Sequence, residues 1–386
     1  MKRTLAVLVL AALAAGCQND SALRHAGLGH LAIAAGNLDG ALQEFEEAIQ
    51  LDGALATAYC GLGDAYLKQG KAEKAVSPYR QAILAMPFEF TFQFRLGTVY
   101  QVLDRDREAA LTYEGAVQLD PDYPPVNINL GVVYYRIGVA DADSASRAAL
   151  LEKGRQYAEK AVELAPEHGF AWSNLGAIYD GLGDPHRAIG AYRKSLQIDP
   201  DQAPVHVNLG TAYLSQGRLD KALDEFKLAQ GLDPDSVVIR KRIAYVYAKQ
   251  KKYGPALEQW QEALKTDPED YEARNNLAAV YMIFYLRRPE QDHIRVQALE
   301  EWHQSLENRS DQPEIRAMLA KWSKPGAALA ARPGDEAATE AMIESPDDGP
   351  WVARDHGLIS HLCASTGRWT APASAHRIAA GPIAEP

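Results

Sequence analysis

Between Trp172 and Pro200 the chain reads WSNLGAIYDGLGDPHRAIGAYRKSLQIDP. Leu175 and Tyr179 are four residues apart, which places both side chains on one side of a helix. The second half carries Ala, Tyr and Ser at spacings of four and three, which describe another helix face. Gly183-Asp184-Pro185 is a turn signal between the halves. The stretch therefore predicts two amphipathic helices joined by a tight turn.

The same pattern recurs along the chain every 34 residues, with one step of 45. A fixed period of this length indicates a stacked array of small units, each of which packs on its neighbours. We number each unit so that the recurring small residue is position 8. Position 8 is then occupied by Gly29, Gly63, Gly97, Gly131, Gly176, Gly210, Ala244 and Ala278.

Aromatic side chains follow the same period. A small residue at position 8 allows the second helix of each unit to approach closely, at a helix-propensity cost of up to about 1 kcal/mol for glycine. The aromatic residue at position 24 is expected to fill that space, so we interpret this row as core and not as a binding site. It comprises Phe45, Tyr79, Tyr113, Tyr192, Phe226, Trp260 and Trp302.

These features resemble the tetratricopeptide repeat, whose pattern of Trp, Leu-Gly, Tyr, Ala, Phe, Ala and Pro is nearly complete in the quoted stretch. The resemblance covers roughly residues 22–306. It implies an all-α fold, a right-handed superhelical solenoid of about eight helix-turn-helix repeats. We assign the repeats to residues 22–55, 56–89, 90–123, 124–168, 169–202, 203–236, 237–270 and a degenerate 271–310.

Two repeats depart from the period. Repeat four holds 11 extra residues between Tyr134 and Pro166, about three helical turns, so its second helix can lengthen without rotating its apolar face. Asp143 or Ser144 is expected to cap that helix. The eighth repeat carries about eight extra residues around 287–289, and residues 311–322 are expected to form a capping helix.

The N-terminus resembles the signal peptide of a bacterial lipoprotein. Lys2-Arg3 precedes an apolar run that ends in Ala14-Ala15-Gly16-Cys17, although Leu is commoner than Ala at the place of Ala14. The resemblance implies removal of residues 1–16, lipidation of Cys17 and a short tether over residues 17–21. Gln18 after the cysteine favours the outer membrane, with the chain facing the periplasm. The alternative is an ordinary secretory signal with an incidental cysteine.

Beyond the repeats, residues 323–386 lose the helical period, and 28 of these 64 residues are Ala, Gly or Pro. This composition predicts a mostly disordered tail. Its segment PWVARDHGLISHLC, from Pro350 to Cys363, is the part expected to dock or to form local structure.

The sequence carries little catalytic chemistry. The formal net charge of −11 disfavours nucleic-acid binding, because phosphate neutralisation supplies most non-specific affinity. Cys60 and Cys363 are not expected to pair. His356, His361 and Cys363 are too few for a structural zinc site. We expect no metal, no cofactor, no small-molecule substrate and no enzymatic activity.

The residues at position 6 of successive repeats are not explained by packing alone. In tetratricopeptide arrays the first helices line a concave groove, and position 6 points into it. The row resembles the asparagine ladder of O-linked N-acetylglucosamine transferase, which implies binding of an extended peptide; the alternative is that asparagine braces neighbouring helices. The carboxylate clamp of chaperone-binding repeats is absent. Candidate groove residues are Arg95, Asn129, Asn174, Asn208, Lys241, Arg242 and Asn276.

The sequence thus predicts a lipid-anchored cell-envelope scaffold that binds an extended segment of an envelope protein, for example in pilus, secretion or cell-wall machinery. The alternative is a substrate-recruiting subunit for a separately encoded envelope enzyme such as a glycosyltransferase. Membrane attachment is expected through the lipid, since an acidic chain is repelled by an anionic bilayer surface.

Overall fold

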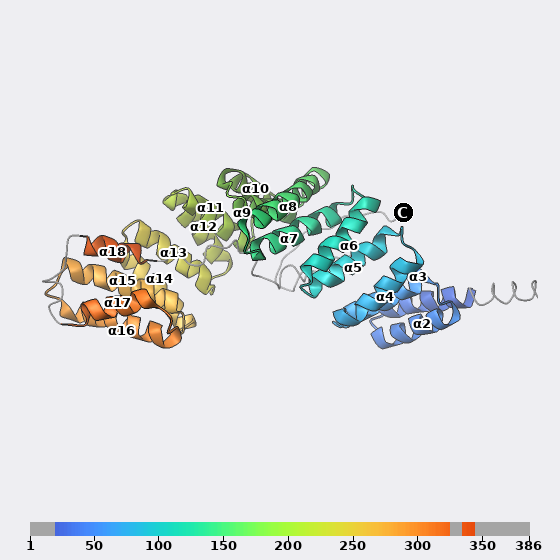
Figure 1. Cartoon of the computed structure of the whole chain (residues 1–386), viewed down its shortest axis with the longest axis horizontal. Coiled ribbons are helices and arrows are strands. Elements are labelled where there is room, and N and C mark those ends of the chain that lie inside the picture. Colours follow the sequence, from blue (N-terminus) through green and yellow to red (C-terminus); the bar gives the residue numbers. More distant parts are fainter. Residues whose placement is uncertain (1–19, 325–333, 344–386) are drawn as a thin grey trace, which may run out of the picture. The chain divides into compact units, whose positions relative to one another are not determined.

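The computed structural model of the chain describes residues 20–324 and 334–343 (Figure 1). Every regular element in these two ranges is a helix and none is a strand, which confirms the predicted all-α class. No helix in the described ranges has the length and hydrophobicity needed to cross a membrane. The predicted signal peptide, Cys17 and the segment 350–363 lie outside the described residues.

The chain divides into two compact units at Ala140. The described part of the first unit begins with a helix over residues 20–34. Its later helices pack as successive antiparallel pairs, α3 with α4 and α5 with α6, and each pair contacts the next (Figure 1). They are α2 (Leu38–Leu51), α3 (Ala56–Lys68), α4 (Ala72–Ala85), α5 (Phe90–Val102), α6 (Asp106–Leu119) and α7 (Pro124–Ala140).

The described part of the second unit repeats the same arrangement. Its paired helices are α9 with α10, α11 with α12, α13 with α14, and α15 with α16, while α17 packs on α16 and α18 on α15. The bounds are α8 (Ser144–Leu164), α9 (Gly169–Gly181), α10 (Pro185–Ile198), α11 (Ala203–Ser215), α12 (Leu219–Leu232), α13 (Val237–Lys249), α14 (Tyr253–Thr266), α15 (Tyr271–Arg287), α16 (Asp292–Asn308), α17 (Pro313–Trp322) and α18 (Asp335–Ala341).

The turn inside each regular repeat needs a left-handed residue at position 15. Gly183 takes this conformation with φ of 75°, and glycine does so without a Cβ clash. In repeats three and seven Asp104 and Lys251 adopt it instead, with φ of 55° and 58°. The next helix then starts on a cap: Asp184 Oδ1 accepts a hydrogen bond from the Arg187 amide at 3.1 Å.

The core lies between the paired helices, where the position 24 aromatic packs against position 8. A Cβ added to Gly176 would lie 2.6 Å from Cε1 of Tyr192, and one added to Gly210 the same distance from Phe226. Tyr192 and Phe226 are completely buried. The interpretation of these rows as packing residues is therefore confirmed.

Repeat four is divided between the two units, since α7 belongs to the first and α8 to the second. The sequence placed its extra length in the second helix. In the structure both helices are longer than the usual 13 or 14 residues, with 17 in α7 and 21 in α8. Asp143 caps α8, because its Oδ1 accepts a hydrogen bond from the Ser146 amide at 2.7 Å.

The end of the array differs from expectation in one respect. Residues 335–341 lie in the predicted disordered tail, yet they form α18, which packs against α15. Seven residues are too few to display a helical period, and a glycine and a proline flank them in the sequence, so composition concealed this helix. Residues 313–322, within the predicted capping segment, form α17, which buries Ile315, Leu319 and Trp322.

Candidate peptide-binding face

One side of each first helix carries position 6. Positions 2, 6, 9 and 13 are separated by four, three and four residues, so they lie on the same side of an α-helix. We call this side the position-6 face. On α9 it comprises Phe170, Asn174, Ala177 and Gly181, and on α15 it comprises Glu272, Asn276, Ala279 and Ile283.

In the first unit the predicted groove residues bond to the preceding repeat. The Arg95 guanidinium forms an ion pair with the Asp64 carboxylate, which also accepts a hydrogen bond from the Tyr79 hydroxyl. Asn129 donates from Nδ2 to the Tyr113 hydroxyl at 3.0 Å. Arg95 and Asn129 are both half-buried. These two side chains therefore brace neighbouring repeats.

Burial dominates the electrostatics around Asp64. It raises the pKa of the Cys60 thiol to about 12, and the negative charge of Asp64 adds to the shift. Burial also raises the pKa of the Tyr79 hydroxyl, again with a contribution from Asp64. Cys60 and Tyr79 are consequently protonated at neutral pH, so the Cys60 thiol is not a reactive nucleophile.

In the second unit the candidate residues are more deeply buried than the sequence suggested. Asn174, Asn208 and Asn276 expose 0, 2 and 1% of their surface, and Arg242 exposes 2%. The sequence expectation was side chains that line an open groove. Buried amides and guanidinium groups must be hydrogen-bonded to be tolerated. Their role in ligand binding stays a prediction.

Arg242 shows how position 6 is held in this unit. Its Nη1 donates to Thr211 Oγ1 at 3.1 Å, and Thr211 is position 9 of the preceding repeat. Arg95 and Asp64 are related in the same way, as position 6 and position 9 of consecutive repeats. These braces could have been predicted from the sequence by comparing the residue at position 6 of each repeat with the residue at position 9 of the repeat before it.

Lys241 is also engaged within the chain. Its Nζ lies 2.8 Å from both Asp270 Oδ2, at the N-cap of α15, and Glu272 Oε2, in the first turn of that helix. Burial lowers the pKa of Lys241, but hydrogen bonds from the ammonium to the two carboxylates outweigh it and the net shift is upward. Lys241 is one of the candidate groove residues predicted from the sequence. Two carboxylates of this chain already neutralise Lys241.

Asp180 adds an unusual acid near the position-6 row, at position 12 of α9. Burial raises its pKa to about 6, and the positive charge of Arg242 partly opposes this shift. Desolvation disfavours the charged carboxylate, so Asp180 takes up a proton more readily than an exposed aspartate.

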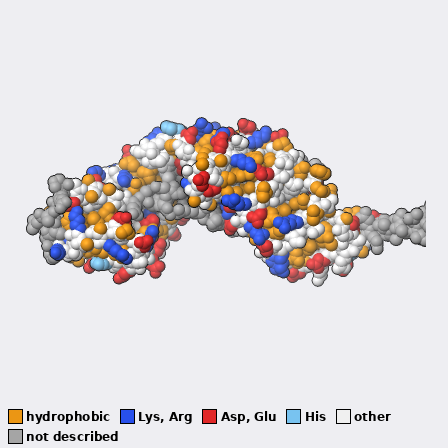
Figure 2. Space-filling view, viewed as in Figure 1, with side chains coloured by type: hydrophobic (Ala, Val, Ile, Leu, Met, Phe, Trp, Pro, Cys, Tyr) orange, Lys and Arg blue, Asp and Glu red, His pale blue; other side chains and the backbone are white. Residues whose placement is uncertain are grey.

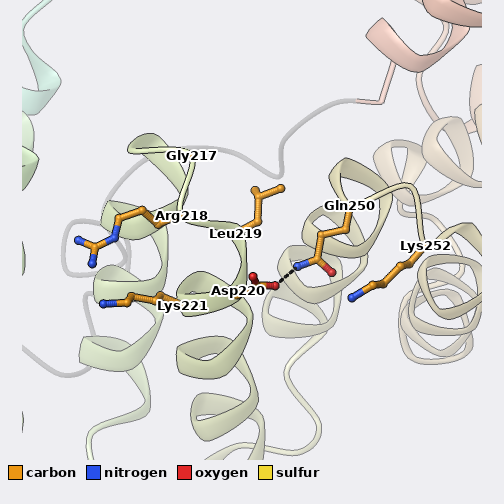
Figure 3. A pocket seen from close by; sticks show the side chains of 7 residues that line it. All are labelled: Gly217, Arg218, Leu219, Asp220, Lys221, Gln250 and Lys252. Atoms are coloured by element: carbon orange, nitrogen blue, oxygen red, sulfur yellow. Dashed lines mark hydrogen bonds between the residues drawn. The ribbon is translucent and has the colours of Figure 1, made fainter.

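A shallow hollow between two inter-helix turns is lined by Arg218, Lys221 and Lys252 and by Asp220, to which Gln250 Nε2 donates at 2.9 Å (Figure 3). Figure 2 shows acidic and basic side chains interspersed over the coloured surface. Within residues 20–324 and 334–343 no three His, Cys, Asp or Glu side chains are grouped as metal ligands.

Models of the tetratricopeptide repeat family match residues 29–70 and 244–282, residues 60–124 and 139–203, and residues 181–240. The chain belongs to the tetratricopeptide repeat family. Such repeats are protein-interaction modules that present extended surfaces to partners. This membership confirms the resemblance drawn from the Trp172–Pro200 stretch.

Several solved structures are similar to parts of this tetratricopeptide chain. A crystal structure of MamA protein is 24% identical, covers 47% of this chain and 94% of its own, and has a TM-score of 0.42. PilF of Pseudomonas aeruginosa is 22% identical, covers 56% and 93%, and has a TM-score of 0.46. YrrB, described as a TPR protein with an unusual peptide-binding site, is 19% identical, covers 50% and 93%, and has a TM-score of 0.41. A comparison with curated proteins finds no match.

Proposed function

We propose that this tetratricopeptide protein is a lipid-anchored scaffold of the cell envelope, and that its position-6 face binds an extended segment of a partner protein. Cys17 is the proposed lipid attachment site, and the outer membrane facing the periplasm is the proposed location. The partner class is an envelope protein of a pilus, secretion or cell-wall machine.

One observation carries the binding proposal. In repeat eight a segment from outside the repeats, α18, packs on α15, and Ile343 beyond it is buried in a cluster with Ala279 and Ile283. These two residues belong to the position-6 face of α15. The face of a first helix thus accommodates another stretch of polypeptide.

The chemistry of the row suits a main-chain ligand. Each asparagine amide offers one acceptor and two donors, which match the carbonyl and N–H groups of an extended peptide. Position 9 carries the small side chains Ala177 and Ala279; both are completely buried, so a ligand backbone reaches them only by displacing the groups that cover them now. Because Asn174 and Asn208 are buried, binding requires that the ligand replace or share the contacts that they make now.

The binding proposal is tested with Asn174→Ala combined with Asn208→Ala in the full chain. The variant is expected to lose capture of the partner found by crosslinking in intact membranes, while circular dichroism shows an unchanged fold. The matched control is Gln197→Ala combined with Gln297→Ala, which removes two exposed carboxamides from second helices. Equal capture by both folded variants contradicts the proposal. Capture that yields a glycosyltransferase favours the enzyme-recruiting alternative.

The anchor is tested separately with Cys17→Ser. The wild-type chain is expected to fractionate with membranes and to incorporate labelled fatty acid. The variant is expected to do neither. A variant that still fractionates with membranes in a salt wash shows that an element other than Cys17 holds the protein there.

A further inference from the structure

The helix α18 is attached to the second unit by a set of charged contacts. Lys251 Nζ lies 3.1 Å from Glu340 Oε1, and the Tyr253 hydroxyl donates to the same oxygen at 2.6 Å. One helical turn earlier, Arg287 pairs with Glu336. Carboxylates at positions 336 and 340 share one side of α18, which faces the α13–α14 turn and the end of α15.

A second charged contact fixes the start of α18. Lys321, in the last turn of α17, lies 2.6 Å from Asp335 Oδ1. Thr339 is fully buried, and its hydroxyl donates to the Asp335 carbonyl at 2.8 Å. The helix is therefore held at its start by Lys321 and along one side by Lys251, Tyr253 and Arg287.

The apolar contacts lie at the C-terminal end of the segment. Ile343 exposes 5% of its surface and belongs to the cluster that includes Ala248, Ala279 and Ile283. Ala279 and Ile283 are positions 9 and 13 of α15, and Ala248 is position 12 of α13. Met342 packs against the neighbouring cluster, in which Met282 is completely buried. Ile343 thus covers the C-terminal end of the position-6 face of repeat eight, while Met342 packs on the cluster beside that face.

We propose that residues 335–343 are an internal ligand that occupies the C-terminal end of the peptide-binding face. A partner segment of the same chemistry, with two acidic residues four apart followed by an aliphatic pair, displaces it. This inference rests on the proposed function of the position-6 face. It adds the class of ligand that binds to repeats seven and eight. Tethering to α17 gives the internal copy an effective concentration in the millimolar range, so a free segment competes poorly until the internal contacts are weakened.

The test uses a fluorescein-labelled synthetic peptide of residues 334–344 and the full chain. The open variant carries Glu336→Ala, Glu340→Ala and Ile343→Asp. It is expected to bind the peptide at least tenfold more tightly than the wild-type chain in fluorescence anisotropy, because its own segment no longer occupies the face. The matched control removes two exposed carboxylates elsewhere, with Glu307→Ala and Glu314→Ala, and is expected to bind as weakly as the wild type.

A second variant tests the charge contacts without removing the apolar ones. Arg287→Glu is expected to weaken the peptide's binding to the open variant, and a peptide with Glu336→Arg is expected to restore it. Equal peptide affinity of the open and wild-type chains, or no binding to either, overturns the internal-ligand inference. If the open variant binds the peptide but the Asn174/Asn208 substitutions leave partner capture unchanged, the proposed function fails while the internal ligand stands.

Discussion

At the scale of single residues, position 6 joins one repeat to the repeat before it. Arg95 pairs with Asp64, and Arg242 donates to Thr211, in each case from position 6 to position 9 of the preceding repeat. A buried charged or amide group is tolerated only with such partners. The row therefore contributes to the stability of the stack in addition to any part it plays in binding.

The Arg95–Asp64 pair provides the first prediction. Arg95→Ala leaves a largely buried carboxylate without its cation, and we expect a loss of about 3 kcal/mol in the free energy of unfolding. Lys265→Ala, which removes an exposed partner of Glu262, is the control and is expected to leave the free energy of unfolding almost unchanged. Urea denaturation of both variants measures the difference. Similar losses in the two would contradict the bracing role.

Position 8 provides the second prediction. Gly176→Ala places a Cβ 2.6 Å from the Tyr192 ring, so we expect the clash to outweigh the gain in helix propensity and to lower stability by about 1–2 kcal/mol. Gly190→Ala, on the exposed side of α10 where a Cβ meets no atom within 4 Å, is expected to raise stability by about 0.5–1 kcal/mol. Thermal unfolding that shows the same sign for both substitutions argues against close packing at position 8.

At the scale of elements, the regular helix pairs follow directly from the sequence. The 34-residue recurrence of a leucine, a small residue and an aromatic residue fixes both helices and their turn in repeats such as Trp172–Pro200. Two elements escaped it for physical reasons. The sequence shows that repeat four has an insertion but not which of its two helices the extra residues lengthen, and in the structure both α7 and α8 are longer. Helix α18 is too short to show a helical period.

The cap of α8 provides the third prediction. Asp143→Ala removes the acceptor for the Ser146 amide, and we expect a loss of about 1 kcal/mol in stability. Asp143→Asn keeps a side-chain acceptor at the cap, and its free energy of unfolding is expected to fall by only a few tenths of a kcal/mol. Chemical denaturation of the two variants decides; an alanine variant as stable as wild type shows that the cap is dispensable.

Helix α18 provides a prediction on pH. The Tyr253 hydroxyl, and then Lys251 and Arg287, lower the pKa of Glu340, and together they outweigh the upward effect of burial. A carboxylate with a lowered pKa stabilises the docked state above the ordinary glutamate pKa of about 4.3, and this contribution is lost as the pH falls through the lowered value. We therefore expect α18 to be fully docked at neutral pH and to detach progressively below about pH 4.

Methyl NMR measures this detachment through the Ile343 signal. Between pH 6.5 and 3.5 the signal is expected to move toward its free-chain position, while the buried Ile178 methyl signals in α9 report whether the fold persists. Glu340→Gln is expected to weaken docking at neutral pH and to flatten its pH dependence. A pH profile of Ile343 that is the same in both chains rules out Glu340 as the titrating group.

At the scale of the whole molecule, the sequence predicted the class of protein but not how deeply the residues of its position-6 face are buried. Helical phase tells which side of α9 carries Asn174, and it does not tell what covers that side. Nor does a fixed period show that a segment outside it, such as α18, lies against the last repeats. Those contacts depend on residues far apart in the chain, which no local pattern records.

The central claim is that the position-6 face binds a segment of a partner protein in the cell envelope. It is tested most directly with a photo-crosslinking phenylalanine at Phe170, a half-buried aromatic at position 2 of that face, in the full chain in intact membranes. The matched control carries the same group at Leu228, which is exposed on the second helix α12. We predict that position 170 crosslinks to one contiguous segment of one partner and position 228 does not. Crosslinks from position 228 alone, or from neither position, would contradict the claim.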